Sequence, residues 1–235
     1  MSYWNGDADS VEDVTKGCLQ LLDVLPQLDS LSYLSVKLPA LQFDTEAVSV
    51  ILRAAARKQR LVHFDSHSPE EAGRMFTVIG DALSRYCHLG CTIPSRWRRS
   101  IDDARTAAGW GLRIRVVKGQ WADPLEPGMD MRVEFLKIVD ELAGRANRVA
   151  VASHDVPLAE EALRRLLVHG TPCELELLYG LPRRGALRMA RRLGVPVRFY
   201  VPQGKAWLPY LVRHVRKNPR VLAWLARDIV RGFAG

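Results

Sequence analysis

The fold is indicated by the stretch Leu112-Arg-Ile-Arg-Val-Val-Lys-Gly119, in which branched apolar residues alternate with arginines before a Lys-Gly pair. Successive side chains of a β-strand point to opposite faces, so this pattern predicts a strand with one apolar and one polar face. A barrel wall, seen from its helix-covered outside and from its interior, has this character. The stretch therefore favours a strand of a closed barrel.

Similar β-rich runs recur along the chain and alternate with amphipathic stretches of helical period. Seven strands and seven helices in alternation predict a parallel α/β architecture. We expect the helix after residue 67 to begin at Ser68, with Pro69 in its first turn. The other strands are expected at residues 31–38, 60–64, 89–93, 148–153, 174–180 and 195–204, and the helices at 7–28, 45–59, 68–83, 95–108, 129–146, 157–169 and 183–193.

The number of units favours a (β/α)8 barrel of TIM type over an open doubly wound sheet. Residues 1–4 can form a truncated first strand, and eight units in 235 residues average about 29 residues each. A doubly wound sheet usually carries an early GxGxxG or GxxxxGK[ST] loop, and neither occurs in this sequence. We predict a single domain over residues 1–235.

Composition excludes several protein classes. Hydrophobic residues make up 48% and charged residues 26%, which is ordinary for a globular protein and excludes a disordered chain. No apolar run is long enough to span a bilayer, and we see no secretory signal. The four cysteines lack paired metal-binding spacing, so we expect reduced, mostly buried thiols in a cytoplasmic protein.

The net charge of +8 is unevenly placed, because residues 183–235 hold 13 Lys and Arg against the single acid Asp228. Such a strongly basic C-terminal part is compatible with peripheral contact to the inner face of a membrane. The favoured interpretation is that these basic side chains lie on the solvent-exposed faces of helices near the C-terminus. No nucleic-acid motif accompanies the charge, so no nucleic-acid partner is expected.

Polar residues cluster where the predicted strands end. In a (β/α)8 barrel the loops after the strands converge on one mouth, where chemistry takes place. The recurrence of such residues predicts a functional site there. They are Lys37, His63, Asp65, His67, Arg115, Lys118, Ser153, His154, Asp155, Glu174, Glu176, Tyr179, Tyr200 and Gln203.

Seven segments, in register, resemble the proline dehydrogenase family. Ala152-Ser-His-Asp155 is similar to that family's Ala-Thr-His-Asn, and Leu177-Leu-Tyr-Gly180 to its Met-Leu-Tyr-Gly. The resemblance runs from residue 4 to residue 219 and lacks the family's usual N-terminal helical segment. The other segments are Leu112–Gly119, Arg198-Phe-Tyr-Val-Pro-Gln-Gly204, Leu208-Pro-Tyr-Leu-Val-Arg213, Leu34-Ser-Val-Lys-Leu38 and Phe64-Asp65.

This resemblance implies a barrel that binds FAD and oxidises L-proline, or a related cyclic amino acid, to Δ1-pyrroline-5-carboxylate, with electrons passed to a quinone. Arg213 and Lys37 would hold the substrate carboxylate, Asp65 would hold Lys37, and Tyr200 would pack on the ring. Arg115 and Lys118 would favour the reduced flavin. The implied cofactor-binding residues are Arg115, Val117, Lys118, Gly119, Trp121, Ser153, His154, Glu176 and Tyr179, and the substrate residues are Lys37, Asp65, Tyr200, Arg213 and His214.

The sequence departs from the family pattern at several of these positions. His214 stands where a second clamp arginine is usual, and Lys217 where an acid is usual. Pro94 and Glu176 each occupy a position where the family has a glutamine. Gln120 and Trp121 replace the usual Ala and Tyr, so a changed substrate or a barrel without turnover is also compatible with the sequence.

Two other functions remain open at this point. A metal-dependent hydrolase would use His63, Asp65 and His67, which alternate along one predicted strand and so share a face, together with His154 and Asp155. A catalytically impaired barrel would act as a binding module through its basic C-terminal part.

Overall fold

The computed structural model describes residues 1–206, and Arg213, His214 and Lys217 lie outside these residues. The described strands form one nine-stranded sheet in which every pairing is parallel. The strands are β1 Ser2–Tyr3, β2 Leu34–Lys37, β3 Val62–Asp65, β4 Leu89–Pro94, β5 Arg113–Val117, β6 Arg148–Ala152, β7 Cys173–Leu178, β8 Val197–Tyr200 and β9 Pro202–Gln203.

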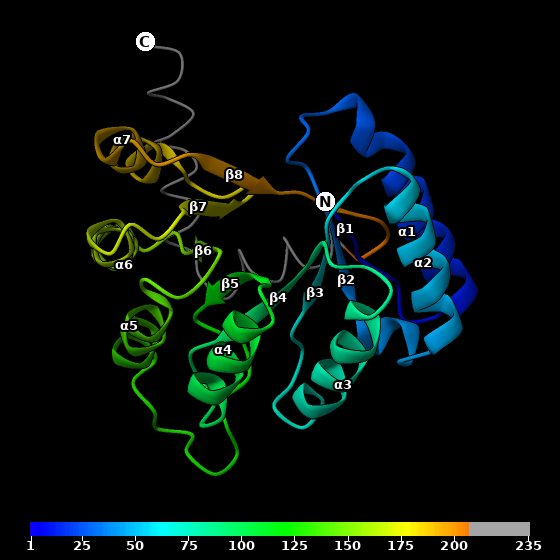
Figure 1. Cartoon of the computed structure of the whole chain (residues 1–235), viewed down its shortest axis with the longest axis horizontal. Helices are drawn as coiled ribbons and strands as arrows, with labels where there is room; N and C mark the ends of the chain where they lie inside the picture. Colours follow the sequence, from blue (N-terminus) through cyan, green and yellow to red (C-terminus); the bar gives the residue numbers. More distant parts are fainter. Residues whose placement is uncertain (207–235) are drawn as a thin grey trace.

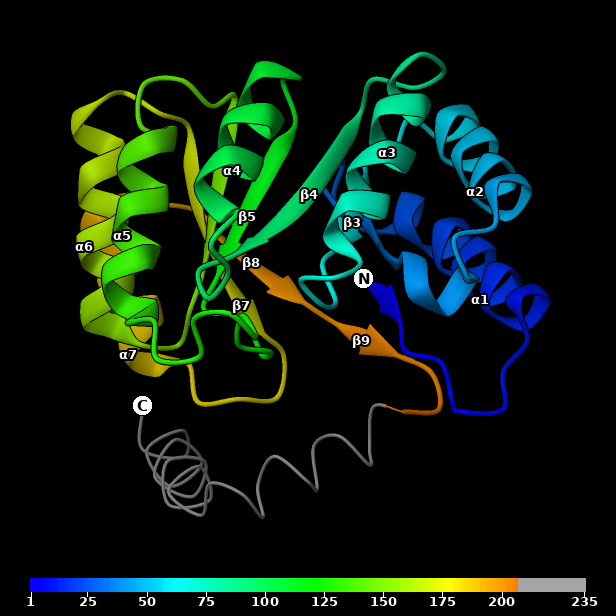
Figure 2. The same cartoon turned by 90° about the horizontal axis from the view of Figure 1, so that it is seen from below.

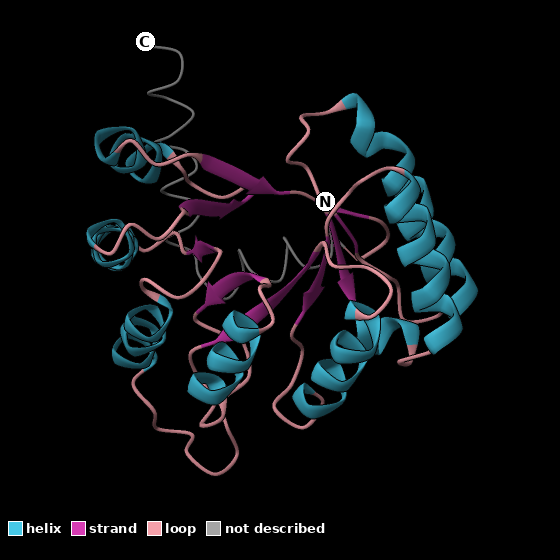
Figure 3. Ribbon diagram, viewed as in Figure 1, coloured by secondary structure: helices cyan, strands magenta, loops and turns pink. Residues whose placement is uncertain are grey.

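Helices cover the outside of this sheet (Figures 1 and 3). The α-helices are α1 Val11–Val24, α2 Thr45–Arg57, α3 Ala72–Leu83, α4 Ser100–Gly109, α5 Met131–Leu142, α6 Val156–Val168 and α7 Arg184–Leu193, with short 3-10 helices η1 Leu25–Gln27 and η2 Leu38–Leu41. No helix within residues 1–206 is both long and apolar enough to cross a membrane.

The last strand closes the barrel by changing partners. β8 pairs with β7, and after Val201 the same segment continues as β9, which pairs with β1. Val201 accepts a hydrogen bond from the Ser2 amide at 3.1 Å, at the point of the change. Figure 2 shows this segment running from the β7 side of the sheet to β1. The predicted TIM-type barrel is confirmed, with residues 1–4 supplying the short first strand.

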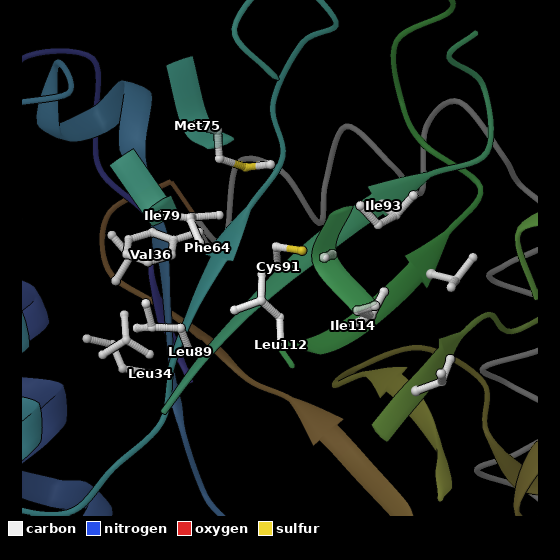
Figure 4. Packing of buried hydrophobic residues seen from close by; sticks show 14 of the residues in the cluster. Leu34, Val36, Phe64, Met75, Ile79, Leu89, Cys91, Ile93, Leu112 and Ile114 are labelled. Carbon is white, nitrogen blue, oxygen red and sulfur yellow. The ribbon is translucent and has the colours of Figure 1, made fainter. Parts of the chain in front are cut away.

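Because side chains alternate along each strand, they point in turn outward to the helices or inward to the centre of the barrel. Leu34, Val36 and Phe64 point outward and pack against α-helical residues such as Ile79 (Figure 4). Their neighbours in sequence, including Ser35, are polar and point inward. Burial of the outward row provides the hydrophobic stabilisation that holds the helices on the sheet. The barrel thus keeps its apolar core between sheet and helices and a polar interior.

Three predicted helix starts are wrong by several residues. α1 begins at Val11 rather than at residue 7, because the Ser10 side chain accepts from the Asp13 amide and caps the helix there. α3 begins at Ala72 rather than at Ser68, because the Ser68 hydroxyl donates to the Glu71 carboxylate at 3.4 Å instead of capping backbone N–H groups. α4 begins at Ser100 rather than at Ser95. The Ser95 hydroxyl is bonded to the carbonyl oxygens of Lys118 and Met131, which holds it in a loop.

The cysteines behave as expected. All four are free, and Cys18, Cys91 and Cys173 are buried while Cys87 is exposed. Burial raises the pKa of the Cys18 thiol to about 12, so it stays protonated at neutral pH.

Candidate functional site

A cleft of about 1490 Å³ opens at the carboxyl ends of the strands. Its floor is formed by side chains that point into the barrel, among them Lys37, Asp65 and Arg115. Its rim is formed by the loops after β3, β5, β6 and β7 and by the start of α7. The predicted site at the barrel mouth therefore coincides with a real cavity.

The floor of the cleft holds a buried ion-pair cluster around Arg115. Its guanidinium lies between two carboxylates: it is bonded to Asp65, and its Nε is 2.7 Å from Glu176 Oε1. Nη2 also donates to the hydroxyl of Tyr33 at 2.8 Å, and that hydroxyl donates to Glu176 Oε2 at 2.6 Å. Because each buried charge has opposite charges and hydrogen-bond partners beside it, the cost of removing it from water is offset.

Asp65 is the shared acceptor of this cluster. Its Oδ1 accepts from Ser35 Oγ at 2.8 Å as well as from Arg115, and its Oδ2 accepts from the Tyr200 hydroxyl at 2.8 Å. No ion pair joins Asp65 to Lys37 among the described residues. In this structure Arg115 occupies the Asp65 carboxylate, and Asp65 acts on Lys37 through its charge rather than through a direct bond, so the expectation that Asp65 holds Lys37 stays a prediction.

A second cluster lies deeper, below the floor. Arg113 bonds to Glu174 and donates to Glu176 Oε2 at 2.8 Å, and Arg198 Nη2 donates to Glu174 Oε2 at 3.0 Å. Among the described residues, the two clusters thus pair three arginines with three buried carboxylates, namely Arg113, Arg115 and Arg198 with Asp65, Glu174 and Glu176. The three positive charges of these arginines equal the three negative charges of these carboxylates.

The arginines act on the acidity of Glu176. Burial by itself would raise its pKa, but Arg115, Arg113 and the Tyr33 hydrogen bond together lower the pKa from 4.5 to about 2. A carboxyl group with a folded-state pKa below its unfolded value stabilises the fold above the unfolded pKa and loses that contribution as the pH falls.

We therefore expect the free energy of unfolding to decline as the pH falls from about 4.5 through about 2, where Glu176 takes up its proton. Urea unfolding at a series of pH values measures this decline. In Glu176→Gln the slope over this interval should be shallower, since a titrating group is gone. The surface variant Glu46→Gln, which removes one exposed partner of Arg53, is the control. Equal slopes in the parent and Glu176→Gln would contradict the assignment.

Lys37 differs from the arginines because no hydrogen bond or ion pair to its Nζ is found within residues 1–206. The ammonium lies 4.1 Å from the centroid of the Trp4 ring, and both residues line the cleft. Desolvation lowers its pKa, and the Asp65 carboxylate opposes that shift. A half-buried cation with space in front of it is suited to meeting an anionic group of a ligand.

Tyr200 lies between Asp65 and Trp4. Its hydroxyl donates to Asp65 and accepts from Trp4 Nε1 at 3.2 Å, and its ring lines the cleft. Burial and the Asp65 charge raise the pKa of Tyr200 well above its ordinary value, so it remains neutral at physiological pH. The ring is thus held rigidly at the floor with its hydroxyl already in use.

Lys118 and the residues after β6 form the rim. Lys118 Nζ donates to Asp155 Oδ2 at 2.7 Å, and Arg132 bonds to the same carboxylate oxygen. Asp155 also caps α6 through the Leu158 amide. Lys118 therefore has a carboxylate partner, as Arg115 has, but Lys118 and Arg132 share the single charge of Asp155, so this part of the rim keeps a net positive charge.

His154 and Ser153 are placed by backbone contacts. His154 Nε2 accepts from the Leu178 amide at 3.0 Å, and Nδ1 donates to the Pro182 carbonyl at 3.0 Å. Ser153 Oγ accepts from the Asp155 amide at 3.1 Å. Both residues line the cleft, where His154 fixes the loop after β7.

Gly119 and Trp121 shape the loop after β5. Gly119 has a φ of +85°, and a Cβ there would lie 2.9 Å from Pro94 Cβ, so only glycine fits without strain. The Trp121 ring lies 4.6 Å from that of His67, centroid to centroid, across the cleft rim. Val117, Glu176 and the Gly119 loop line the cleft, whereas Tyr179 is half exposed outside its lining.

The metal-hydrolase alternative is not supported. His63 is fully buried: Nδ1 accepts from Arg113 and Nε2 donates to Thr92 Oγ1 at 3.0 Å, so both nitrogens are occupied. His67 lies outside β3 and pairs with Glu71 at 3.0 Å. No group of three or more metal-binding side chains is found among residues 1–206.

Reasoning from the sequence missed two residues of the site, Tyr33 and Ser35, and left Arg113 without a role. Arg113 and Arg115 share the inward face of β5, so their two-residue spacing was the available signal. Tyr33 precedes β2 by one residue, and nothing in its sequence surroundings marks it.

Solved structures with the same fold were found by comparison. The proline utilization A (PutA) protein from Bdellovibrio bacteriovorus, inactivated by N-propargylglycine, superposes with a TM-score of 0.78 at 18% identity, over 92% of this chain and 29% of that one. PutA from Corynebacterium freiburgense superposes with a TM-score of 0.74 at 17% identity, over 97% of this chain and 29% of that one.

A comparison of sequences found similar proteins that are named proline dehydrogenase. The proline dehydrogenase of Deinococcus radiodurans is 28% identical over 163 residues, which cover 66% of this chain and 52% of the relative. Proline dehydrogenase 1 of Bacillus subtilis is 23% identical over 233 residues, covering 93% of this chain and 76% of the relative.

The chain is similar in sequence to proline dehydrogenases. It spans about half the length of the Deinococcus proline dehydrogenase and less than a third of the PutA chains. No protein-family profile matches it. The resemblance to proline dehydrogenases that its motifs indicated is confirmed in both sequence and fold.

Proposed function

We propose that this chain is a flavin-dependent oxidoreductase that converts L-proline, or a related cyclic amino acid, to Δ1-pyrroline-5-carboxylate and passes the electrons to a quinone. The observation that carries the proposal is the large cleft at the barrel mouth, whose lining includes the residues of the proline dehydrogenase-like motifs. The named relatives support the substrate and the reaction class.

The cleft fits a dinucleotide together with a small substrate. Pockets for one small molecule commonly have about 300–1,000 Å³, and this cleft is larger. Its rim carries basic side chains suited to phosphates, among them Lys118, Arg184 and Arg188, and the aromatic ring of Trp121. Gly119 leaves the backbone open to close approach. These residues, with Val117, Ser153 and His154, would hold FAD.

The bound flavin would supply the acceptor for two electrons from the substrate. Oxidation removes two electrons and two protons from the ring C–N bond of proline and leaves a C=N bond, with the carboxylate unchanged. Lys37 would bind that carboxylate, and the Tyr200 ring would orient the substrate ring. Arg213 and His214 are proposed, from the resemblance alone, as further carboxylate partners. A cytoplasmic location with peripheral membrane contact through residues 183–235 also remains a proposal.

Absorption spectroscopy tests the proposal. Purified chain, after incubation with FAD and gel filtration, should retain a band at about 450 nm that L-proline bleaches without oxygen. D-Proline is the matched control and should bleach it far more slowly. A protein that retains no flavin, or a band that L-proline leaves unchanged, would overturn the proposed function.

A further inference from the structure

Two layers of charge in the barrel interior differ in their access to the cleft. Asp65, Arg115 and Glu176 line the cleft floor, whereas Arg113, Glu174 and Arg198 lie outside its lining. Glu174 and Glu176 belong to the same strand and point to the same side, two residues apart. Only the carboxyl-end member of this pair reaches the floor, so the two glutamates form a natural comparison.

Glu176 compensates the charge of Arg115. The two side chains are 95% or more buried, and the ion pair joins Arg115 Nε to Glu176 Oε1 at 2.7 Å. Asp65 occupies Nη1 of the same guanidinium. If Glu176 were neutral, Arg113 and Arg115 would together lose one compensating charge in a setting where water screens poorly. The excess positive charge would then act on whatever occupies the floor.

We propose that Glu176 is a positioning residue that sets the electrostatic potential of the cleft floor by neutralising Arg115, leaving Lys37 as the floor cation available to an anionic ligand group. The residue acts through Arg115 rather than on the ligand. The inference rests on the proposed function only where it concerns flavin, because the charge of the floor acts on Lys37 with or without a cofactor.

The first test uses Lys37 as a reporter and requires no flavin. Lys37 and Asp65 are paired in register on β2 and β3, so the reporter lies beside the cluster. The chain has seven lysines, which can be ¹³C-methylated and titrated by NMR, with Lys37→Met assigning the signal. In Glu176→Gln we expect the Lys37 pKa to fall by about half a unit or more, and in Arg115→Gln to rise.

The matched control is Glu174→Gln, which removes the same charge from the same strand but in the deeper layer. Its effect on Lys37 should be less than half that of Glu176→Gln. If Glu176→Gln does not fold, the variants Arg115→Gln and Arg115→Gln/Glu176→Gln test the proposal instead. The double variant restores charge balance, so its Lys37 pKa should return to the parental value. An unchanged Lys37 pKa in Glu176→Gln, or equal shifts in the two glutamate variants, overturns the proposal.

The second test uses the flavin-loaded protein. Glu176→Gln should shift the midpoint potential of the bound flavin to a more positive value, because surplus positive charge stabilises the reduced form, and Glu174→Gln should shift it less. A potential that does not move in Glu176→Gln contradicts the proposal. If the parent protein binds no flavin, the proposed function fails, while the Lys37 titration still decides whether Glu176 sets the charge of the floor.

Discussion

Replacing Arg113 with methionine is expected to lower the free energy of unfolding by about 3–5 kcal/mol at neutral pH. Arg113 is buried at 7% exposure and bonds to both Glu174 and Glu176, so its loss removes one buried positive charge and leaves the interior with one uncompensated negative charge. It also donates to His63, whose pKa burial and the two arginines hold well below the ordinary value. Chemical unfolding measures the loss, with circular dichroism as the readout.

The control for this prediction is Arg145→Ala, which removes an exposed partner of Glu141 on the surface of α5. An ion pair of this kind contributes about 0–1 kcal/mol. Lowering the pH should reduce the difference in the free energy of unfolding between Arg113→Met and the parent, since protonation of one interior carboxylate then removes the uncompensated negative charge. A loss no larger than that of Arg145→Ala would show that the interior network does not stabilise the barrel.

Replacing Lys37 with methionine is expected to weaken the binding of proline, or of a carboxylate inhibitor, by about 10- to 100-fold while leaving the fold intact. A hydrogen bond between a charged donor and a charged acceptor contributes about 1.5–3 kcal/mol, which corresponds to this range. The fold should survive because no described carboxylate or carbonyl group depends on Lys37 Nζ. Ligand titrations followed by flavin difference spectra give the affinity.

The comparison variant is Lys118→Met, which removes a cation of the cleft rim that already pairs with Asp155 at 2.7 Å. Its carboxylate affinity should change less than that of Lys37→Met, while its flavin affinity should fall. An unchanged affinity in Lys37→Met would mean that the substrate carboxylate lies elsewhere in the cleft. A protein that unfolds more readily than the parent would show instead that Lys37 supports the barrel.

Much of the barrel could be predicted because its periodicity is local. The row of apolar residues on one face of residues 112–117 marks both the strand and its helix-covered side, and β5 forms within that stretch. The starts of α3 and α4 could not be predicted in this way. For α4, the Ser95 hydroxyl bonds to the carbonyl oxygen of Met131, which only the fold brings near. For α3, the Ser68 hydroxyl bonds to the Glu71 side chain rather than to a backbone N–H group.

The candidate site was likewise predictable only in part. Strand-end positions place Lys37, Asp65 and Arg115 at the mouth, because parallel strands bring their carboxyl ends together. The sequence did not predict which of these charged side chains stay available to a ligand, because Arg115 could have faced either a ligand or a carboxylate of the protein. The partners of Arg115 come from β3 and β7, far apart along the chain.

The sequence by itself determined the order of strands and helices, the polar inward face of strands such as β5 and the resemblance to proline dehydrogenases, since these properties depend on neighbouring residues and on motifs. The tertiary structure alone decided how charges pair inside the barrel, because ion pairing depends on distances between strands that register and closure set. It matched Arg113, Arg115 and Arg198 with Asp65, Glu174 and Glu176. Lys37 was left facing the cleft without such a partner among the described residues, and that difference separates the cation suited to a ligand from those that hold the barrel together.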